Sequence, residues 1–353
     1  MTQSLTIRSS RTYDVLIGSG LISQAGNLIS ERLHPSSVVI VSDDNVFPLC
    51  GPALYASLET AGIRAETYVF PHGEASKSLS VYGDLLEFIC EKKLTRTDAI
   101  AALGGGVAGD LAGFAAATYQ RGIGFVQIPT SLLADVDSSV GGKTAIDLKG
   151  GKNQAGCFYQ PMLVICDTDT LATLPEAEYR NGCAEIIKYA MIGSGSLFHS
   201  IGALPIREQY SKVIAECVAM KRDIVEKDEY DTGLRMLLNF GHTVGHAVET
   251  CSGYSIPHGK AVAIGMAVIT RAACREGICP PETRDSLLSL IGQYSLPSET
   301  EYHVRELAGI IANDKKGSGN RLRLVVPEKI GSCAILDIAK DDIAAWLREG
   351  GVS

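Results

Sequence analysis

Three of the chain's seven histidines lie close together, at His242, His246 and His258. Upstream, the run Gly104-Gly105-Gly106-Val107-Ala108-Gly109-Asp110 has the glycine content of a loop that binds a dinucleotide. The clustered imidazoles indicate a metal ion, so a metal and a nicotinamide are implied together. A cation acidifies a hydroxyl, and a nicotinamide accepts the hydride from the carbon that bears it. The two features predict an enzyme that interconverts alcohols and carbonyls.

The spacing of the histidines leaves their roles open. In a helix, His242 and His246 lie on one face, and a third ligand from elsewhere would complete a metal site with positions left for substrate. The same spacing allows one or both to be hydrogen-bonded histidines of the core. His258 lies between Pro257 and Gly259, so we expect it in a turn rather than in the interior of a helix.

The glycine run also has two interpretations. Without Cβ atoms its backbone can approach a pyrophosphate, and the following helix N-terminus, with about +0.5 charge, adds affinity for anions. The run is neither a GxGxxG fingerprint nor a P-loop, so the alternative is a tight strand-to-helix turn without a ligand. Asp110 would repel a phosphate unless its carboxylate faces a ribose or an amide, which is the orientation that we expect.

Apolar runs that end in polar residues recur in the first half of the chain. Residues 38–41 precede Asp43 and Asn45, residues 99–103 precede the glycines, and residues 125–128 and 163–166 repeat the pattern. Parallel strands present their carboxyl ends at one edge of a sheet, where ligands bind, so Asp43, Asn45 and the glycine run should share one site. We predict a Rossmann-like α/β domain with a parallel sheet of at least about five strands.

From Leu171 onward the pattern changes to helical periodicity. Val213, Cys217 and Ile224 recur at helical spacing, with Lys221 among the polar positions that we place on other faces. Alanines and Gly265 within 261–273 predict a buried helix packed closely on a neighbour, and residues 321–326 predict a strand. A chain of this length exceeds one ordinary core. We therefore expect an α/β domain over residues 1–170 and a mainly α-helical domain over 171–353.

Composition excludes several classes of protein. The 353 residues carry a formal net charge of -8, which argues against binding to nucleic acid or to anionic membranes. We find no apolar segment typical of a signal peptide and no uninterrupted apolar stretch typical of a membrane span. The ten cysteines form no CxxC pair, and a chain of this size needs no disulfides, so we expect reduced thiols. These features predict a cytoplasmic globular protein.

Longer segments are specific enough to carry a family resemblance. The chain resembles the 3-dehydroquinate synthase family at residues 104–110, 121–122, 127–134, 137–143, 151–153, 182–188, 238–246, 258–266 and 314–316, which fall in the family's order. The resemblance implies a phosphate-eliminating lyase of the shikimate pathway of aromatic amino acid biosynthesis. Its substrate would be 3-deoxy-D-arabino-heptulosonate 7-phosphate and its product 3-dehydroquinate. It also implies NAD, zinc or cobalt, and a homodimer.

The resemblance further implies roles for individual residues. It assigns the metal to Glu185, His242 and His258, and it leaves His246 to contact substrate and move protons. The implied substrate contacts are Lys143, Lys188, Lys221, Arg235, Asn239, His246, Lys315 and, from a second subunit, Arg121, with Asp137 holding a hydroxyl and Asp231 acting in proton transfer. The implied NAD contacts are Asp43, Asn45, Glu74, Lys77, Gly105, Gly106, Val107, Asp110, Thr130, Ser131, Lys143, Lys152, Asn153, Thr170, Leu171 and Thr173.

Three positions depart from the family's pattern. Asp231 stands where a glutamate is common, Lys260 stands where a glutamate often follows the His-Gly pair, and Asp147 stands where an asparagine is usual. The Asp231 change shortens the side chain by one methylene. The implied metal ligands and the glycine run are unaffected.

Other functions fit parts of the sequence. A related sugar phosphate cyclase with a substrate that lacks a carboxylate would keep NAD, metal and elimination, but Arg235 with Lys221 favours a carboxylate. A metal-dependent polyol dehydrogenase of the glycerol dehydrogenase type would consume NAD and would not need Lys143, Lys152 and Lys188. A noncatalytic module that senses a dinucleotide is the third alternative.

Overall fold

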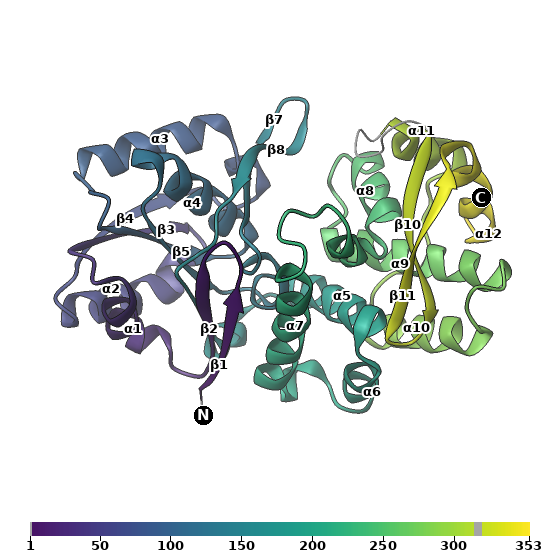
Figure 1. Cartoon of the computed structure of the whole chain (residues 1–353), viewed down its shortest axis with the longest axis horizontal. Coiled ribbons are helices and arrows are strands. Elements are labelled where there is room, and N and C mark those ends of the chain that lie inside the picture. Colours follow the sequence, from purple (N-terminus) through teal and green to yellow (C-terminus); the bar gives the residue numbers. More distant parts are fainter. Residues whose placement is uncertain (1, 314–319) are drawn as a thin grey trace. The chain divides into compact units, whose positions relative to one another are not determined.

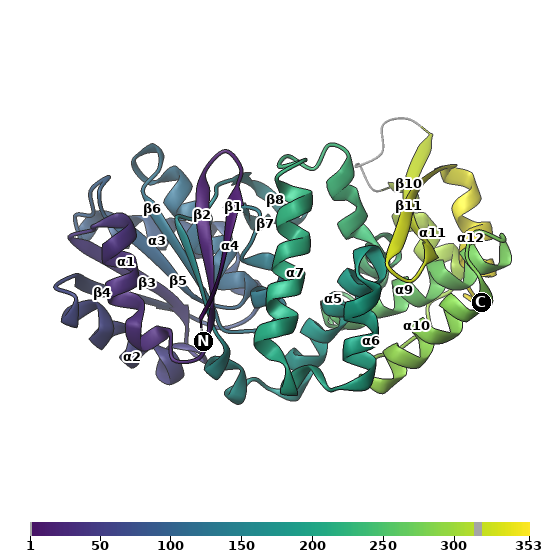
Figure 2. The same cartoon turned by 60° about the horizontal axis from the view of Figure 1, so that its bottom comes forward.

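The computed structural model describes residues 2–313 and 320–353, and these form two compact units. The first unit comprises Met1–Pro175 and Tyr210–Tyr230, and the second comprises Glu176–Gln209 and Asp231–Ser353. Helix α7 (Tyr210–Val225) therefore belongs to the first unit, although it follows helices of the second in the chain. It lies beside the β1–β2 hairpin, where Glu226 accepts a hydrogen bond from the backbone N–H of Arg8 at 2.7 Å (Figure 2).

A sheet of seven described strands, in the order β1-β2-β9-β6-β5-β3-β4, forms the centre of the first unit. Its neighbouring strands are all parallel except β1 and β2. The predicted Rossmann-like parallel sheet is therefore confirmed. The strands are β1 (Gln3–Arg8), β2 (Thr12–Gly18), β3 (Ser37–Asp43), β4 (Arg64–Phe70), β5 (Ala99–Gly104), β6 (Gly124–Pro129) and β9 (Leu163–Asp167), with a separate hairpin of β7 (Lys143–Leu148) and β8 (Gly151–Phe158).

Helices cover both faces of this sheet (Figure 1). Val38 and Ile40 of β3 pack in one cluster with residues of α1 and α2, whereas Val39 and Val41 pack in a second cluster with residues of α3 and α4. Burial on both faces explains why the strand sequences are continuously apolar rather than alternating. The helices are α1 (Ala25–Leu33), α2 (Phe47–Thr60), α3 (Leu79–Glu91) and α4 (Gly106–Thr118), with shorter helices at Ile22–Gln24, Glu74–Ser76, Tyr119–Arg121, Ala134–Ser138 and Thr168–Thr173.

The second unit is mainly helical, as the periodicity predicts, with one antiparallel hairpin. The hairpin pairs β10 (Arg321–Lys329) with β11 (Ser332–Ala339), which confirms the strand expected at 321–326. Its helices are α5 (Glu176–Gly193), α6 (Gly195–Ala203), α8 (His242–Cys251), α9 (His258–Arg275), α10 (Pro281–Gln293), α11 (Val304–Asn313) and α12 (Ile343–Glu349), with shorter helices at Ile206–Glu208, Leu234–Asn239 and Lys340–Asp342.

Two further expectations can be compared with the structure. All ten cysteines are free thiols, as predicted. Among the described helices, none combines the length and the apolar character needed to cross a membrane.

Helices α8 and α9 approach each other closely because glycines lie where they meet. Gly241 precedes α8 with φ +80°, a left-handed conformation that glycine adopts readily. A Cβ built on Gly265 of α9 would lie 1.9 Å from the carbonyl oxygen of Gly241. The predicted close packing of this buried helix is therefore confirmed. It fixes the first residue of α8 relative to α9.

We expect Gly265→Ala to destabilise the protein by about 3 kcal/mol, the upper end of the range for overpacking a packed interior. The added methyl group would collide with backbone, so the two helices must separate. Gly292→Ala is the control, because Gly292 is an exposed position of α10 with no atom within 4 Å of its built Cβ. That change should be neutral or slightly stabilising. Urea unfolding of both variants measures the difference, and an unaltered midpoint for Gly265→Ala would contradict the packing argument.

Candidate active site

Side chains from three helices of the second unit converge on one point. Glu185 comes from α5, His242 is the first residue of α8, and His258 is the first residue of α9. Glu185 Oε1 lies 3.1 Å from His258 Nε2 and 3.6 Å from His242 Nε2. One ligand atom from each lies within 4.8 Å of the other two. One carboxylate and two imidazoles form a donor set that suits zinc or cobalt. We name these three residues the Glu185 cluster.

Burial sets the charge states of the Glu185 cluster. Glu185 is fully buried, and burial lowers the pKa of His242 well below its usual value although Glu185 opposes this shift. His242 Nδ1 lies 3.2 Å from the carbonyl oxygen of Phe240, which leaves Nε2 for Glu185. Burial also disfavours a charged His258, but hydrogen bonds with Glu185 and Glu249 outweigh it and raise the pKa of His258 to about 10. A neutral imidazole such as that of His242 is the form that binds a metal.

His258 lies outside a helix interior, as predicted, but in place of the expected turn it is the first residue of a helix. Pro257 is the N-cap of α9, with φ -58° and ψ 144°, and His258 begins the helix. The Pro-His-Gly sequence suggests a turn because glycine disfavours helices. Here Gly259 serves close packing instead, since a Cβ on it would lie 2.3 Å from the carbonyl oxygen of Asn181 on α5.

Two further predicted residues lie beside the Glu185 cluster. Lys188, one turn after Glu185 on α5, is 1% exposed and forms an ion pair through Nζ with Glu185 Oε2. Each charge compensates the burial of the other. The ring centroid of His246 lies 5.4 Å from that of His242 and 6.2 Å from that of His258. A metal-binding donor set, an ammonium group and a third imidazole are therefore adjacent.

Glu249 belongs to the same group of side chains, and our interpretation of the sequence missed it. It lies on α8 with its Oε2 3.4 Å from His258 Nδ1. His246, Glu249 and His258 form a second set whose ligand atoms lie within 4.8 Å of one another. The available signal was spacing, because His242, His246 and Glu249 recur at intervals that place them on one face of a helix.

Other predicted residues of the second unit lie before α8. Arg235 and Asn239 belong to the short helix Leu234–Asn239, and Arg235 is 2% exposed. A guanidinium is always charged, and charged side chains are seldom as deeply buried as that of Arg235. Asp231 is half-buried and has φ +60°. Lys315 lies outside the described residues.

In the first unit, predicted residues gather at the carboxyl ends of neighbouring parallel strands. Asp43 ends β3, and its Oδ1 accepts hydrogen bonds from the backbone N–H groups of Asn45 and Val46 at 2.9 Å. The neighbouring strand β5 ends at Gly104, where a built Cβ would lie 3.6 Å from Asp43 Oδ2. The strand ends therefore bring together residues that are distant in sequence. The predicted positions that follow β3, β5, β6 and β9 are Asn45, Gly105, Gly106, Val107, Thr130, Ser131, Thr170, Leu171 and Thr173.

The glycine run is the turn from β5 into α4. Gly105 is the N-cap of α4, and no side chain caps the helix there. A Cβ on Gly105 would lie 3.4 Å from Ser131 Oγ. Because glycine has no Cβ, the space between the Gly105 backbone and Ser131 stays open. The N–H groups of the first turn of a helix have no partners within it, which suits a phosphate ligand.

A charged network lies near the start of α4. Lys77 Nζ lies 2.9 Å from Asp110 Oδ2 and 3.3 Å from Glu74 Oε1, and Lys152 Nζ lies 3.6 Å from the same Glu74 oxygen. Burial disfavours a charged Lys77, but Asp110 and Glu74 outweigh it and raise its pKa. Burial raises the pKa of Asp110 to about 6 although Lys77 opposes this shift. The Asp110 carboxylate therefore faces an ammonium group in this structure.

The periodicity suggested that Lys221 lies on a polar face of its helix. The structure shows that it does not. It is 6% exposed, and its Nζ donates to the backbone oxygen of Asp137 at 2.6 Å and pairs with the Asp137 carboxylate. Helical spacing cannot show that a second element covers the lysine. Lys143 begins β7, and Asn153 lies in β8, where its backbone N–H donates to Asp147 Oδ1 at 2.7 Å. Arg121 ends the short helix after α4, with φ +67°.

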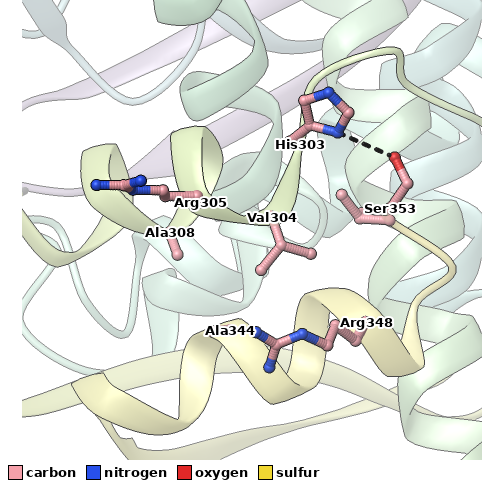
Figure 3. A pocket seen from close by; sticks show the side chains of 8 residues that line it. His303, Val304, Arg305, Ala308, Ala344, Arg348 and Ser353 are labelled. Carbon is pink, nitrogen blue, oxygen red and sulfur yellow. Dashed lines mark hydrogen bonds between the residues drawn. The ribbon is translucent and has the colours of Figure 1, made fainter.

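A hollow of about 730 Å³ opens elsewhere in the second unit, between α11 and α12 (Figure 3). His303, Arg305 and Arg348 contribute its polar groups. It contains none of the predicted site residues, so we do not assign it to the chemistry of the Glu185 cluster.

Comparison with protein families gives a consistent result along the chain. The family model described as 3-dehydroquinate synthase N-terminal matches residues 67–181, and the one described as 3-dehydroquinate synthase C-terminal matches residues 182–317. A 3-dehydroquinate synthase of Enterococcus faecalis (strain ATCC 700802 / V583) is 42% identical over 348 residues, covering 97% of each chain. One of Streptococcus suis (strain 05ZYH33) is 41% identical over 352 residues, covering 98% of this chain and 99% of its own.

Solved structures share the fold. A 2-epi-5-epi-valiolone synthase from Streptomyces hygroscopicus subsp. jinggangensis 5008, with NAD+ and Zn2+ bound, matches with a TM-score of 0.87 and 26% identity, covering 98% of this chain and 99% of its own. A 2-deoxy-scyllo-inosose synthase matches with a TM-score of 0.88 at 24% identity, covering 99% and 100%. A glycerol dehydrogenase from Schizosaccharomyces pombe matches with a TM-score of 0.63 at 16% identity, covering 96% and 89%.

The raised pKa of Asp110 predicts a specific pH dependence of stability. Because the pKa of Asp110 is about 6 in the folded state and 3.8 for an ordinary aspartate, its contribution to stability is fully present below pH 3.8 and is lost as the pH rises through about 6. The free energy of unfolding of the wild type relative to Asp110→Asn should therefore increase as the pH falls from about 7.5 to about 4.5. Urea unfolding at several pH values measures it.

Asp84→Asn, at an exposed position of α3, is the matched control and should follow the wild type at every pH. A difference between wild type and Asp110→Asn that stays constant across this range would show that Asp110 does not take up the proton.

Proposed function

The chain belongs to the 3-dehydroquinate synthase family, and we propose that it converts 3-deoxy-D-arabino-heptulosonate 7-phosphate into 3-dehydroquinate and orthophosphate. This reaction makes it a carbon–oxygen lyase that also closes a carbocycle. The observation that carries the proposal at the level of residues is the Glu185 cluster with Lys188 beside it. It combines donors for a metal with a buried ammonium group for an anionic substrate.

Glu185, His242 and His258 are the residues that would hold a divalent metal, zinc or cobalt. Three protein donors leave coordination positions for substrate hydroxyls. When bound, the metal acidifies a substrate hydroxyl, and NAD accepts and later returns the hydride at the carbon that bears it. Lys188 pairs through Nζ with the second oxygen of Glu185, which places its ammonium group beside the residues that would hold the metal.

The substrate carries a phosphate and a carboxylate, so its site needs cations although the chain is acidic overall. Arg235 is buried, and its planar guanidinium suits a carboxylate with two parallel hydrogen bonds. This favours a substrate with a carboxylate over a sugar phosphate that lacks one, which a related cyclase would take. His246 and Asp231 move protons, Asp137 holds a hydroxyl, and the remaining substrate contacts are Lys143, Lys221, Asn239, Lys315 and, from a second subunit, Arg121.

NAD binds at the strand ends of the first unit. Gly105, Gly106 and Val107 at the N-terminus of α4 would hold its pyrophosphate, because uncapped N–H groups attract an anion without requiring cationic side chains. Asp43 and Asp110 accept hydrogen bonds from ribose or amide groups. The further NAD contacts are Asn45, Glu74, Lys77, Thr130, Ser131, Lys143, Lys152, Asn153, Thr170, Leu171 and Thr173.

Three wider assignments complete the proposal. NAD binding belongs to the domain of residues 1–170, and metal binding and most substrate contacts belong to the domain of residues 171–353, of which Tyr210–Tyr230 packs with the first unit. The enzyme acts as a homodimer in which Arg121 of one chain serves the other. It works in the cytoplasm, a reducing compartment in which ten free thiols are stable.

The test is an assay with the heptulosonate phosphate and a catalytic amount of NAD. Orthophosphate and the cyclic product should accumulate without net NADH, because the hydride returns to the substrate. Lys188→Ala should lose about 100-fold or more in turnover and keep its NAD affinity. Lys329→Ala, at an exposed position of the same unit, should behave as wild type. Net NADH formation would instead indicate a polyol dehydrogenase, and equal turnover of a substrate without a carboxylate would indicate a related cyclase.

The metal assignment has its own test. His258→Ala should lower the zinc content of purified protein from about one ion per chain to a trace, because two donors rarely retain zinc. Elemental analysis after dialysis measures this directly. His199→Ala, which removes an exposed histidine of α6, is the control and should keep the metal. Full zinc content in His258→Ala would rule out this ligand set.

A further inference from the structure

Glu249 lies on the opposite side of the His258 ring from Glu185. Its Oε2 is 3.4 Å from His258 Nδ1, whereas Glu185 Oε1 is 3.1 Å from His258 Nε2. Both carboxylates are buried, at 6% and 0% exposure. A buried carboxylate is costly unless it is paired and hydrogen-bonded, so the position of Glu249 calls for a specific partner.

The chemistry of imidazole gives the two carboxylates different roles. A metal ligand must offer a nitrogen lone pair, and a neutral imidazole has only one, because its other nitrogen carries a proton. Nε2 of His258 faces Glu185, near Nε2 of His242, and it would lose its proton on binding a metal there. Nδ1 then carries the proton and donates it to Glu249. This is the arrangement of a carboxylate, a histidine and a metal in which the outer carboxylate orients the ring.

The second donor set, His246, Glu249 and His258, could also accept a cation by itself. Both sets share His258, so filling both requires its ring to lose both N–H protons. A hydrogen bond from Nδ1–H to Glu249 does not require the ring to lose that proton. The geometry therefore favours one metal in the Glu185 cluster, with Glu249 outside its coordination sphere.

We propose that Glu249 is a positioning residue that holds the Nδ1–H of His258 and so directs Nε2 of that ring toward a metal in the Glu185 cluster. This inference rests on the proposed metal site. The close packing of α8 on α9 at Gly241 and Gly265 supports it, because α8 carries Glu249 and α9 begins with His258. The carboxylate and the ring thus lie on two elements that cannot readily shift apart.

The test measures zinc affinity and stoichiometry by competition with a coloured chelator, independently of turnover. Glu249→Ala should bind zinc about 10- to 100-fold more weakly than wild type while keeping one site per chain. Glu249→Gln should recover part of this loss, because its amide oxygen accepts the same hydrogen bond without the charge. Glu282→Ala, at an exposed position of α10, is the matched control and should bind zinc as wild type does.

Nitrogen NMR of histidine-labelled, zinc-loaded protein reports which nitrogen of the His258 ring carries the proton. A merely structural role of Glu249 would leave this unchanged. The wild type should show His258 protonated at Nδ1, and Glu249→Ala should lose this single tautomer while its NAD affinity stays unchanged. Zinc affinity of Glu249→Ala within twofold of wild type would overturn the inference. So would two zinc ions per wild-type chain with one lost in Glu249→Ala, since Glu249 would then be a ligand. If His258→Ala retains zinc, the metal site itself fails, which is a different result.

Discussion

The buried carboxylate of Glu185 is the constraint on which the second unit depends. It is fully buried on α5, and a charge in such a position is stable only with compensating groups around it. Lys188 pairs with one oxygen, and His258 and His242 lie near the other. Each of these groups is held by a helix whose backbone approaches a neighbour at a glycine, as Gly259 does at Asn181 and Gly265 does at Gly241. Packing and charge compensation therefore specify the same arrangement.

The NAD site that we propose in the first unit would bind an anion although the chain is acidic overall. The sheet of this unit presents backbone N–H groups at the start of α4, where a cation is not needed. The charge of the nearby Lys77 is already balanced, since Lys77 pairs with both Asp110 and Glu74. Such pairing keeps the ammonium group charged in a buried setting and fixes its position. Local geometry, rather than net charge, therefore determines what this surface can bind.

The sequence predicts the fold better than it predicts the site. Strands such as β3 are recognisable because both faces are buried and residues 38–41 are all apolar, and the α8 histidines are recognisable by helical spacing. No periodicity singles out Glu185, because its partners come from helices distant in sequence, so only the family resemblance identified it. Spacing also failed for Lys221, whose burial depends on the segment around Asp137. A local sequence pattern shows which residues share a face of one helix or strand. It does not show which side chains of a second element pack against that face.

The positions that depart from the family pattern show how local backbone limits the choice of side chain. Asp231 has φ +60°, a region that aspartate and asparagine enter more readily than longer side chains such as glutamate. The shorter acid thus suits this backbone. At position 147, the side chain has only to accept a hydrogen bond, because Asp147 Oδ1 accepts the backbone N–H of Asn153 at 2.7 Å. The backbone N–H of Asp147 donates separately to the backbone oxygen of Lys77 at 2.7 Å. An asparagine oxygen would accept the same bond from Asn153, so the carboxylate closes the β7–β8 hairpin while adding a negative charge near two lysines. The link to Lys77 is made by the backbone of Asp147 and does not depend on its side chain.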